Sequence, residues 1–255
     1  LSEVFDWWFV AAYLWGCGVV YLLATAVAFL RGVRIEEAAV EAQCAVIGNT
    51  GFLGVPMLVV LLGPEAAGPV LMVLAVDLIV FSSLITILIT GSRDGRMSLA
   101  ILGTVGKGLL RNPMIVSMTL GLIVSGLSIP IPEVANEFLT ILGAAATPGA
   151  LFAIGASLAG KSAERVQVAG WLSVCKLVLH PAAVALTILV LPMLGLAALS
   201  GEMRIAAILS AAMPMFGIYT VLAQERGLGG AASIAMLVAT SAAFFSLSAL
   251  LFWLT

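Results

Sequence analysis

Polar residues interrupt an apolar run between residues 38 and 62, and their types could form a binding site. The run contains Gly48-Asn49-Thr50-Gly51-Phe52-Leu53-Gly54-Val55-Pro56. Pro56 lacks a backbone N–H and its ring disturbs the preceding turn, so we expect the helix to break there. Inside a membrane, broken backbone is tolerated only where protein or a water-filled cavity covers it, and such half-helix ends commonly build transport sites. The alternative is a kink whose freed groups are satisfied by Thr50 or by a neighbouring helix.

A broken helix of this kind suits an anionic ligand. Unpaired N–H groups and the positive end of the helix dipole face the break, and both favour a carboxylate. Asn49 and Thr50 add hydrogen-bonding side chains, and we expect Gly51 and Pro56 to line the same site beside the freed N–H groups. A second apolar run, 204–223, is interrupted at Pro214. Two such breaks that cross would form one midplane site for a small organic anion; alternatively, both breaks are structural and serve another site.

Lys176 and His180 are four positions apart in a third apolar run, so they share one face of a helix. A buried cation at Lys176 could oppose a substrate carboxylate or release a proton. Lys176 is also close enough to the end of its run for its ammonium group to reach the membrane surface. His180 directly precedes Pro181, and its alternative role is that of a packed, hydrogen-bonded core residue.

Asp77 is the clearest carboxylate inside an apolar run. An unpaired charge in a membrane is costly, so we expect Asp77 to be protonated, paired or facing water. Proton or ion coupling is therefore its candidate role. A direct partnership with Lys176 is strained, because the two residues are counted from opposite faces of the membrane.

The composition places these residues in an integral membrane protein. Hydrophobic residues make up 62% of the chain and charged residues 9%, and the mean hydropathy is +1.21, far from the composition of soluble domains. No basic tract suggests nucleic acid. Cys17, Cys44 and Cys175 have no metal-ligand spacing and are expected to be small core residues, so we expect no metal and no other cofactor.

With about 20 apolar residues per crossing, the chain divides into spans at roughly 9–30, 38–62, 69–90, 112–129, 138–159, 168–192, 204–223 and 233–254. The stretch 91–111 fits either a surface helix or an extension of the next span. Alternating spans place nearly all basic residues on one side, which we expect to be cytoplasmic, with both chain ends outward in the inner (plasma) membrane. This side has Arg31, Arg34, Arg93, Arg96, Lys107, Arg111, Lys161, Arg165 and Arg226, and the other has Arg204.

The spacing of the two interruptions indicates an inverted repeat. Pro214 follows Pro56 by 158 positions, and the same offset maps the first span onto the sixth and the third onto much of the eighth. Because the paired spans run in opposite directions, the repeat is inverted, as in many secondary transporters. We expect residues 1–95 to hold three helices of the first repeat and residues 96–255 the five helices of the second, with two further helices before Leu1.

The chain resembles the auxin efflux carrier family, which includes bacterial malate and malonate permeases. The Asn49–Pro56 run is similar to the broken fourth helix of that family. Other similarities are Arg111-Asn112-Pro113 to the sixth helix, Pro148-Gly149-Ala150-Leu151-Phe152 to the seventh, Lys176 with Pro181 to the eighth and Pro214 to the broken ninth. The resemblance implies an all-α transporter of ten helices with two crossed, broken helices, related in architecture to bile acid and sodium/proton carriers.

We therefore expect a carrier, not an enzyme, that moves a small organic anion by alternating access. Its expected partners are that anion, the lipid bilayer, a coupling proton or sodium ion and, as a candidate, a second copy in a homodimer. The alternative within transport is a cation-coupled symporter or antiporter in which Asp77 binds the ion. A remote alternative is an intramembrane serine protease using Ser157 and His180, which their depths in separate spans disfavour. Zinc-protease and phosphate-loop motifs are missing, so we expect gradients to supply the energy.

Overall fold

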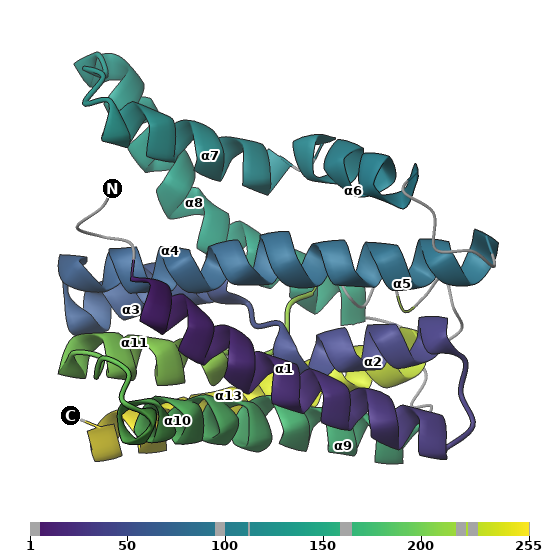
Figure 1. The fold of residues 1–255 in the computed structure, drawn as a ribbon. Helices are drawn as coiled ribbons and strands as arrows, with labels where there is room; N and C mark the ends of the chain where they lie inside the picture. The colour runs from purple at the N-terminus through teal and green to yellow at the C-terminus, as the bar shows by residue number, and fades with distance from the viewer. Residues whose placement is uncertain are drawn as a thin grey trace.

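The computed structural model describes residues 6–94, 100–111, 113–158, 165–217, 223 and 229–254. Within these residues the chain is helical and forms no β-strand, only an isolated bridge (Figure 1). The first part has the helices α1 (Trp7–Leu30), α2 (Ile35–Val46), α3 (Val55–Leu62), α4 (Ala67–Ala75) and α5 (Ser82–Asp94). The second part has α6 (Ala100–Arg111), α7 (Pro113–Gly126), α8 (Glu133–Leu158), α9 (Val166–Val174), α10 (His180–Val190), α11 (Gly201–Ala211) and α13 (Gly229–Leu254).

Four helical segments of the described chain are long and apolar enough to cross a membrane: Trp7–Leu30, Pro64–Ile89, Val166–Leu194 and Gly230–Leu254. They coincide with the first, third, sixth and eighth predicted spans, and the all-α membrane class is confirmed. The other predicted spans contain shorter, interrupted or partly described helices, and their crossing stays a prediction. Predictions that rest on Asn112, on the ends of the spans at residues 159 and 218–222, or on Arg96, Lys161 and Arg226 lie outside the described residues.

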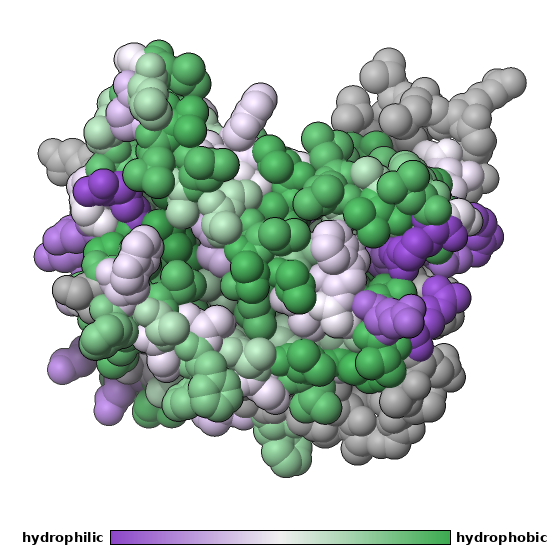
Figure 2. Space-filling model, turned by 90° about the horizontal axis from the view of Figure 1, so that it is seen from below, coloured by the Kyte–Doolittle hydropathy of each residue, from purple (hydrophilic) through white to green (hydrophobic). Residues whose placement is uncertain are grey.

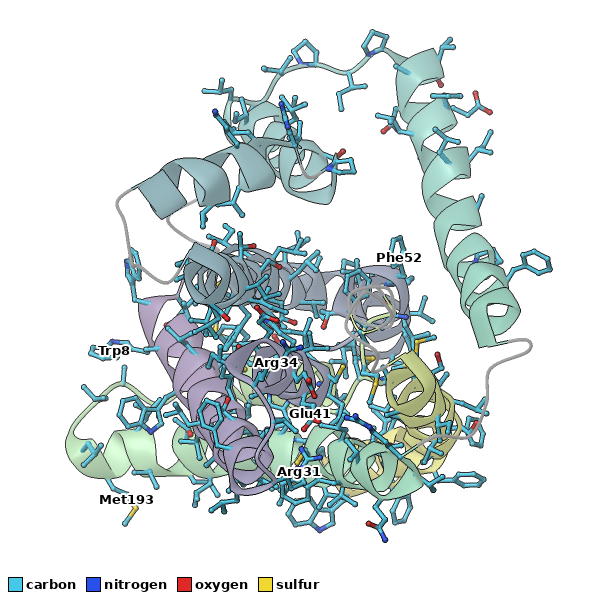
Figure 3. The ribbon with its side chains drawn as sticks, turned by 90° about the vertical axis from the view of Figure 1, so that its right-hand side faces the viewer. Trp8, Arg31, Arg34, Glu41, Phe52 and Met193 are labelled. Atoms are coloured by element: carbon cyan, nitrogen blue, oxygen red, sulfur yellow. The ribbon has the colours of Figure 1, made fainter. Side chains whose placement is uncertain are left out.

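The helices around the predicted site form a bundle in which α1 packs against α2 and α10, and α13 packs against α9. Its core includes Phe9, Leu58, Leu172 and Met213, all nearly fully buried. Burial of such apolar side chains between helices adds little stability in lipid, because the lipid tails are equally apolar. Close packing between the helices matters more. Helices α6 and α7 and much of α8 lie outside this bundle in two perpendicular views (Figures 1 and 3), and they meet it where α6 contacts α5 and where α8 contacts α13 and the turn Thr50–Gly54.

Helices α1 and α10 approach each other closely at Gly16. A Cβ atom at this position would lie 2.8 Å from the Val184 Cα and 2.9 Å from the Val184 backbone nitrogen. Only glycine allows the two backbones to come this near, as in the small-residue contacts of other membrane helices. This contact fixes the position of α1 next to His180, the first residue of α10.

Two of the long membrane segments contain a π-helical turn. One turn, Val76–Phe81, lies between α4 and α5 and contains Asp77; the other, Cys175–Leu179, lies between α9 and α10 and contains Lys176. Single π turns inside α-helices are uncommon and frequently occur at functional sites. The two ionisable residues singled out from the sequence thus both lie where the helix is locally widened.

Charged residues gather at the end of the bundle where α1 is followed by α2. Arg31 forms an ion pair with Glu41, and Glu37 lies 3.7 Å from both Arg34 and Arg165; Arg31, Arg34 and Glu41 are labelled in Figure 3. The start of α1 and the end of α13 lie at the opposite end (Figure 1). Hydrophilic residues gather toward both ends of the molecule, and apolar residues cover much of the face between them (Figure 2).

Candidate functional site

The two interruptions found in the sequence meet in space. Helix α2 ends at Val46, and helical structure resumes with a π turn, Thr50–Gly54, that leads into α3. Helix α11 ends at Ala211. Between these ends the Asn49 N–H donates to the Pro214 carbonyl (2.7 Å) and the Phe216 N–H donates to the Ile47 carbonyl (3.1 Å). The two short extended segments therefore pair antiparallel, with Gly48 opposite Met215.

The first interruption does not lie at Pro56, as we expected, but at residues 47–49. Pro56 lies in the first turn of α3, which continues directly from the π turn, and it is exposed. Pro214, in contrast, is buried in the extended segment, and its carbonyl is the acceptor for Asn49. The position of the first break is therefore set by pairing with the distant segment around Pro214 and not by the local proline.

Several buried oxygen atoms around this pairing have no hydrogen-bond partner in the described part of the chain. They include Asn49 Oδ1, Thr50 Oγ1 and Ser210 Oγ, on side chains that are at most 3% exposed. Buried polar groups of folded proteins nearly always have a partner, and leaving one unpaired costs about 1–3 kcal/mol. A cluster of them is typical of a place that a polar ligand or water occupies. Gly51, on the same π turn, is half-buried.

Lys176 lies directly beside this cluster and is fully buried. Its Nζ donates to the carbonyl of Ala211, the last residue of α11 (2.7 Å), and is 2.8 Å from His180 Nδ1. Gly48 makes room for it, because a Cβ at Gly48 would lie 3.3 Å from both Lys176 Nζ and Thr50 Oγ1. Of the two readings of Lys176, the structure has the buried cation and not the ammonium group that reaches the membrane surface: Nζ turns inward and compensates the negative end of the α11 dipole.

Asp77 is also buried and 1% exposed. Its Oδ1 accepts a hydrogen bond from the Tyr13 hydroxyl (3.1 Å), and Oδ2 has no partner within the described residues. The backbone of Gly48 faces the carboxylate as well. No direct ion pair between Asp77 and Lys176 is among those formed by the described residues.

Two residues of α1 belong to the same cluster and were missed by the sequence reasoning. Tyr13 contacts Asp77, and Cys17 Sγ lies 3.0 Å from His180 Nε2. All three cysteines are buried and free, as expected. Cys17 differs from a purely apolar core residue because its sulfur contacts a ring nitrogen of His180. The signal that could have found the pair is their spacing, since residues four apart lie on one face of a helix.

His180 contacts Lys176 on one ring nitrogen and Cys17 on the other. These contacts fit the packed, hydrogen-bonded role and leave neither nitrogen for a serine nucleophile. Ser157, the other residue of the protease alternative, lies in α8, but its side chain is outside the described residues.

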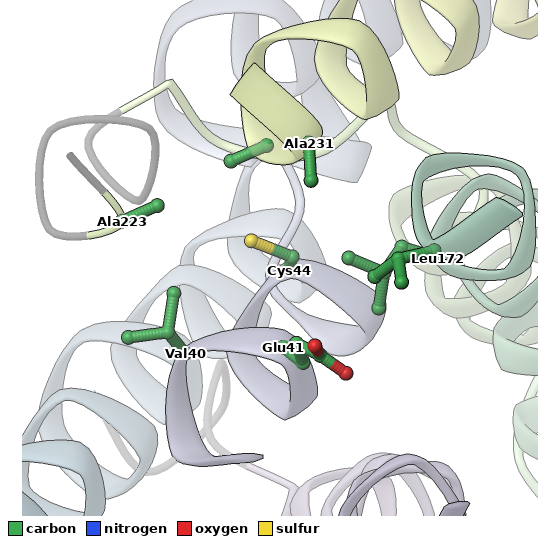
Figure 4. Close-up of a pocket in the computed structure, with 8 residues that line it drawn as sticks. Val40, Glu41, Cys44, Leu172, Ala223 and Ala231 are labelled. Atoms are coloured by element: carbon green, nitrogen blue, oxygen red, sulfur yellow. The ribbon is translucent and has the colours of Figure 1, made fainter. Parts of the chain in front are cut away.

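A small pocket lies apart from this cluster, between α2, α9 and the start of α13 (Figure 4). It is mostly apolar, with the Glu41 carboxylate as its charged group, and Glu41 is paired with Arg31. Nothing in it matches the predicted anion site. Its lining consists of Val40, Glu41, Cys44, Val168, Leu172, Ala223, Ala231 and Ala232.

Comparison with known proteins places the chain in a family. Residues 1–253 match the family model described as "Membrane transport protein", the family of the auxin efflux carriers. A protein of Rhizobium meliloti (strain 1021) named "Putative malonate transporter" is 28% identical over 166 residues. That match covers 64% of this chain and 52% of the relative, so the chain spans about half the length of this curated relative.

The family match covers nearly the whole chain and agrees with the helical, apolar architecture. It confirms the resemblance stated from the Asn49–Pro56 motif. The chain therefore belongs to the membrane transport protein family that contains the auxin efflux carriers.

Proposed function

We propose that this protein is a secondary carrier that binds a small organic anion where its two interrupted helices meet. The observation that carries the proposal is the position of Lys176 beside the paired segments, where the Asn49 side-chain oxygen and the Thr50 and Ser210 hydroxyls have no hydrogen-bond partner in the described part of the chain. Hydroxyl groups can donate to a carboxylate, and the Asn49 side chain carries two amide donors beside its oxygen. The site so composed offers donors and one positive charge, which suits a carboxylate.

The Lys176 ammonium group has one further N–H donor for this ligand. An ammonium group has three N–H donors, and two of them are directed at Ala211 and His180. The third is available to a carboxylate, and hydrogen bonds between charged groups are roughly twice as strong as neutral ones. Malonate, named for the relative from Rhizobium meliloti, is a dicarboxylate of suitable chemistry and the first substrate to test.

The proposed carrier has further features that are inferred from the sequence. Its two broken helices cross at the midplane, residues 1–95 and 96–255 form an inverted repeat, and the protein works by alternating access around the fixed site. The protein lies in the inner membrane with the basic loops in the cytoplasm and both chain ends outward, and a homodimer is a candidate assembly.

Asp77 supports two forms of coupling. Its buried carboxylate, with one oxygen lacking a partner in the described chain, can carry a proton into the bundle. The same oxygen favours the second candidate, a symporter or antiporter in which Asp77 binds sodium. Uptake that depends on sodium at constant pH would establish the second candidate over proton coupling.

The thermal stability of the full-length protein in detergent tests the site. A ligand that binds only the folded state raises the unfolding temperature, so malonate or a related carboxylate should do so for wild type and much less for Asn49→Ala. Thr187→Val is the matched control, because the Thr187 hydroxyl donates to Ala183 within α10, outside the cluster. If no carboxylate stabilises wild type, or if Asn49→Ala responds fully, the proposed site is wrong.

A further inference from the structure

Five buried side chains lie next to one another between α1, α10 and the two π turns, from Lys176 at one end to Asp77 at the other. Lys176 Nζ is 2.8 Å from His180 Nδ1, and His180 Nε2 is 3.0 Å from Cys17 Sγ. Cys17 and Tyr13 are four residues apart on one face of α1, the Tyr13 ring lies 5.9 Å from the His180 ring, and the Tyr13 hydroxyl is 3.1 Å from Asp77 Oδ1. All five side chains are at most 1% exposed.

The hydrogen bonds of this chain can all run in one direction. Lys176 has no acceptor, so its N–H donates to His180 Nδ1, and neutral His180 then has its proton on Nε2 and donates to Cys17. The Tyr13 hydroxyl has one proton, which goes to the Asp77 carboxylate, so its oxygen is left to accept from the Cys17 S–H. Each group therefore donates to the next, from the ammonium end to the carboxylate end.

We propose that Tyr13, Cys17 and His180 form a proton relay between Lys176 and Asp77. Lys176 gives a proton to His180 Nδ1, His180 gives the Nε2 proton to Cys17, Cys17 gives its proton to Tyr13, and Tyr13 gives its proton to Asp77. Each middle group gains one proton and loses one, so only the ends change. Lys176 goes from positive to neutral and Asp77 from negative to neutral.

The relay gives the proposed carrier a physical link between substrate and proton, and it rests on that proposed function. Two separated opposite charges buried in low dielectric are costly, so in the empty site transfer of the proton to Asp77 removes both. A bound carboxylate favours the charged ammonium beside it and draws the proton back to Lys176. Asp77 is then ionised and can take up a proton from water once its side of the bundle opens.

The relay makes a different prediction from a network that only holds α1 in place. A structural network would lose stability and every mode of transport together when a member is truncated. A relay would lose proton-driven uptake while the exchange of substrate for substrate across the membrane continues, because exchange needs no net proton movement.

The test uses the full-length protein in liposomes that contain a pH-sensitive dye. It measures malonate uptake driven by an inward proton gradient and malonate exchange without a gradient. Tyr13→Phe and Cys17→Ala interrupt the relay with little change in shape. Cys17→Ser restores an O–H that both donates and accepts, and Tyr21→Phe and Cys44→Ala are controls, since both residues are buried and lie outside the relay.

We expect Tyr13→Phe and Cys17→Ala to lose proton-driven uptake by roughly tenfold or more, as for removal of a positioned proton-transfer group, and to keep exchange. Cys17→Ser and both controls should behave as wild type. Full proton-driven uptake in Tyr13→Phe and Cys17→Ala, or an equal loss of uptake and exchange, overturns the relay.

A spectroscopic readout separates failure of the relay from failure of the proposed function. If wild type moves no carboxylate, the proposed function fails, and the infrared band of the Asp77 carboxyl group, identified by its loss in Asp77→Asn, still tests the relay. The band should shift in Tyr13→Phe and not in Tyr21→Phe. An unchanged band in Tyr13→Phe overturns the relay.

Discussion

The molecule uses charge in two different ways at its end and at its centre. At the end where α1 turns into α2, Arg31, Arg34 and Arg165 are directly paired with Glu41 and Glu37, and the arginines are partly or largely exposed. At the centre, Asp77 and Lys176 are fully enclosed and are joined through neutral side chains. Direct pairs near water fix the ends of helices, whereas separated charges in the interior can change their state when a ligand arrives.

Removal of the buried charge at Lys176 is expected to have the largest effect on function. Lys176→Ala removes the single positive charge proposed for the carboxylate site, and loss of a buried, hydrogen-bonded charge partner typically weakens binding by about 2–5 kcal/mol. Malonate binding by the purified protein should fall accordingly. Lys107→Ala, at an exposed position of α6, is the control. Equal affinity of the two variants would remove Lys176 from the site.

Moving α1 should have the next largest effect. In Gly16→Ala the new Cβ would lie 2.8 Å from the backbone of Val184, so α1 and α10 must separate, at a cost of about 1–3 kcal/mol. The melting temperature and proton-driven uptake should both fall, because α1 holds Tyr13 and Cys17. Gly18→Ala meets nothing within 4 Å and shares the gain in helix propensity, so it should be at least as stable as wild type. A Gly16→Ala variant as stable as Gly18→Ala would contradict the close contact.

Asp77→Asn should have a narrower effect. The amide keeps the shape of the side chain and can still accept from Tyr13, but it carries no proton into the bundle. We expect malonate exchange to persist and proton-driven uptake to fall by roughly tenfold, measured in the same liposomes. Unchanged proton-driven uptake would exclude Asp77 as the proton carrier.

The smallest effect is expected at the charged end of the bundle. The Arg34–Glu37 pair is 3.7 Å long, and the Arg34 side chain is 74% exposed, so its contribution to stability should be below about 1 kcal/mol. Arg34→Ala should therefore change neither malonate affinity nor, by more than a few degrees, the melting temperature. A large loss of transport in this variant would contradict the view that the exposed ion pairs at the end of the bundle are separate in function from the buried charges at its centre.

The sequence predicted the class of the fold and the types of residue at its centre, but not their pairing. Apolar runs and composition were sufficient for an all-α membrane protein, and Asn49, Thr50, Asp77 and Lys176 stood out because polar groups are costly in such runs. The missing N–H of Pro56 predicts a helix break at that residue, because this reasoning considers only the local sequence. Its actual position depends on hydrogen bonds to residues around Pro214, far away in the chain.

The direction of Lys176 and the roles of Tyr13 and Cys17 depend on packing between helices. Whether a lysine near the end of a span reaches water or turns inward is decided by the acceptors beside it, here the Ala211 carbonyl on another helix. Tyrosine and cysteine are unremarkable in an apolar helix, and only the contacts across α1 with Asp77 and His180 give them a role. Periodicity within one helix does not contain that information.

Equilibrium binding of radiolabelled malonate to the purified full-length protein tests the central claim most directly, with wild type compared with the double variant Thr50→Val and Ser210→Ala. Both substitutions remove a buried hydroxyl that has no partner in the described chain, and each hydrogen bond to a charged ligand contributes about 1.5–3 kcal/mol. The account predicts saturable binding to wild type and binding weaker by roughly tenfold or more in the double variant. Equal binding by the two proteins would contradict a carboxylate site at the meeting of the interrupted helices.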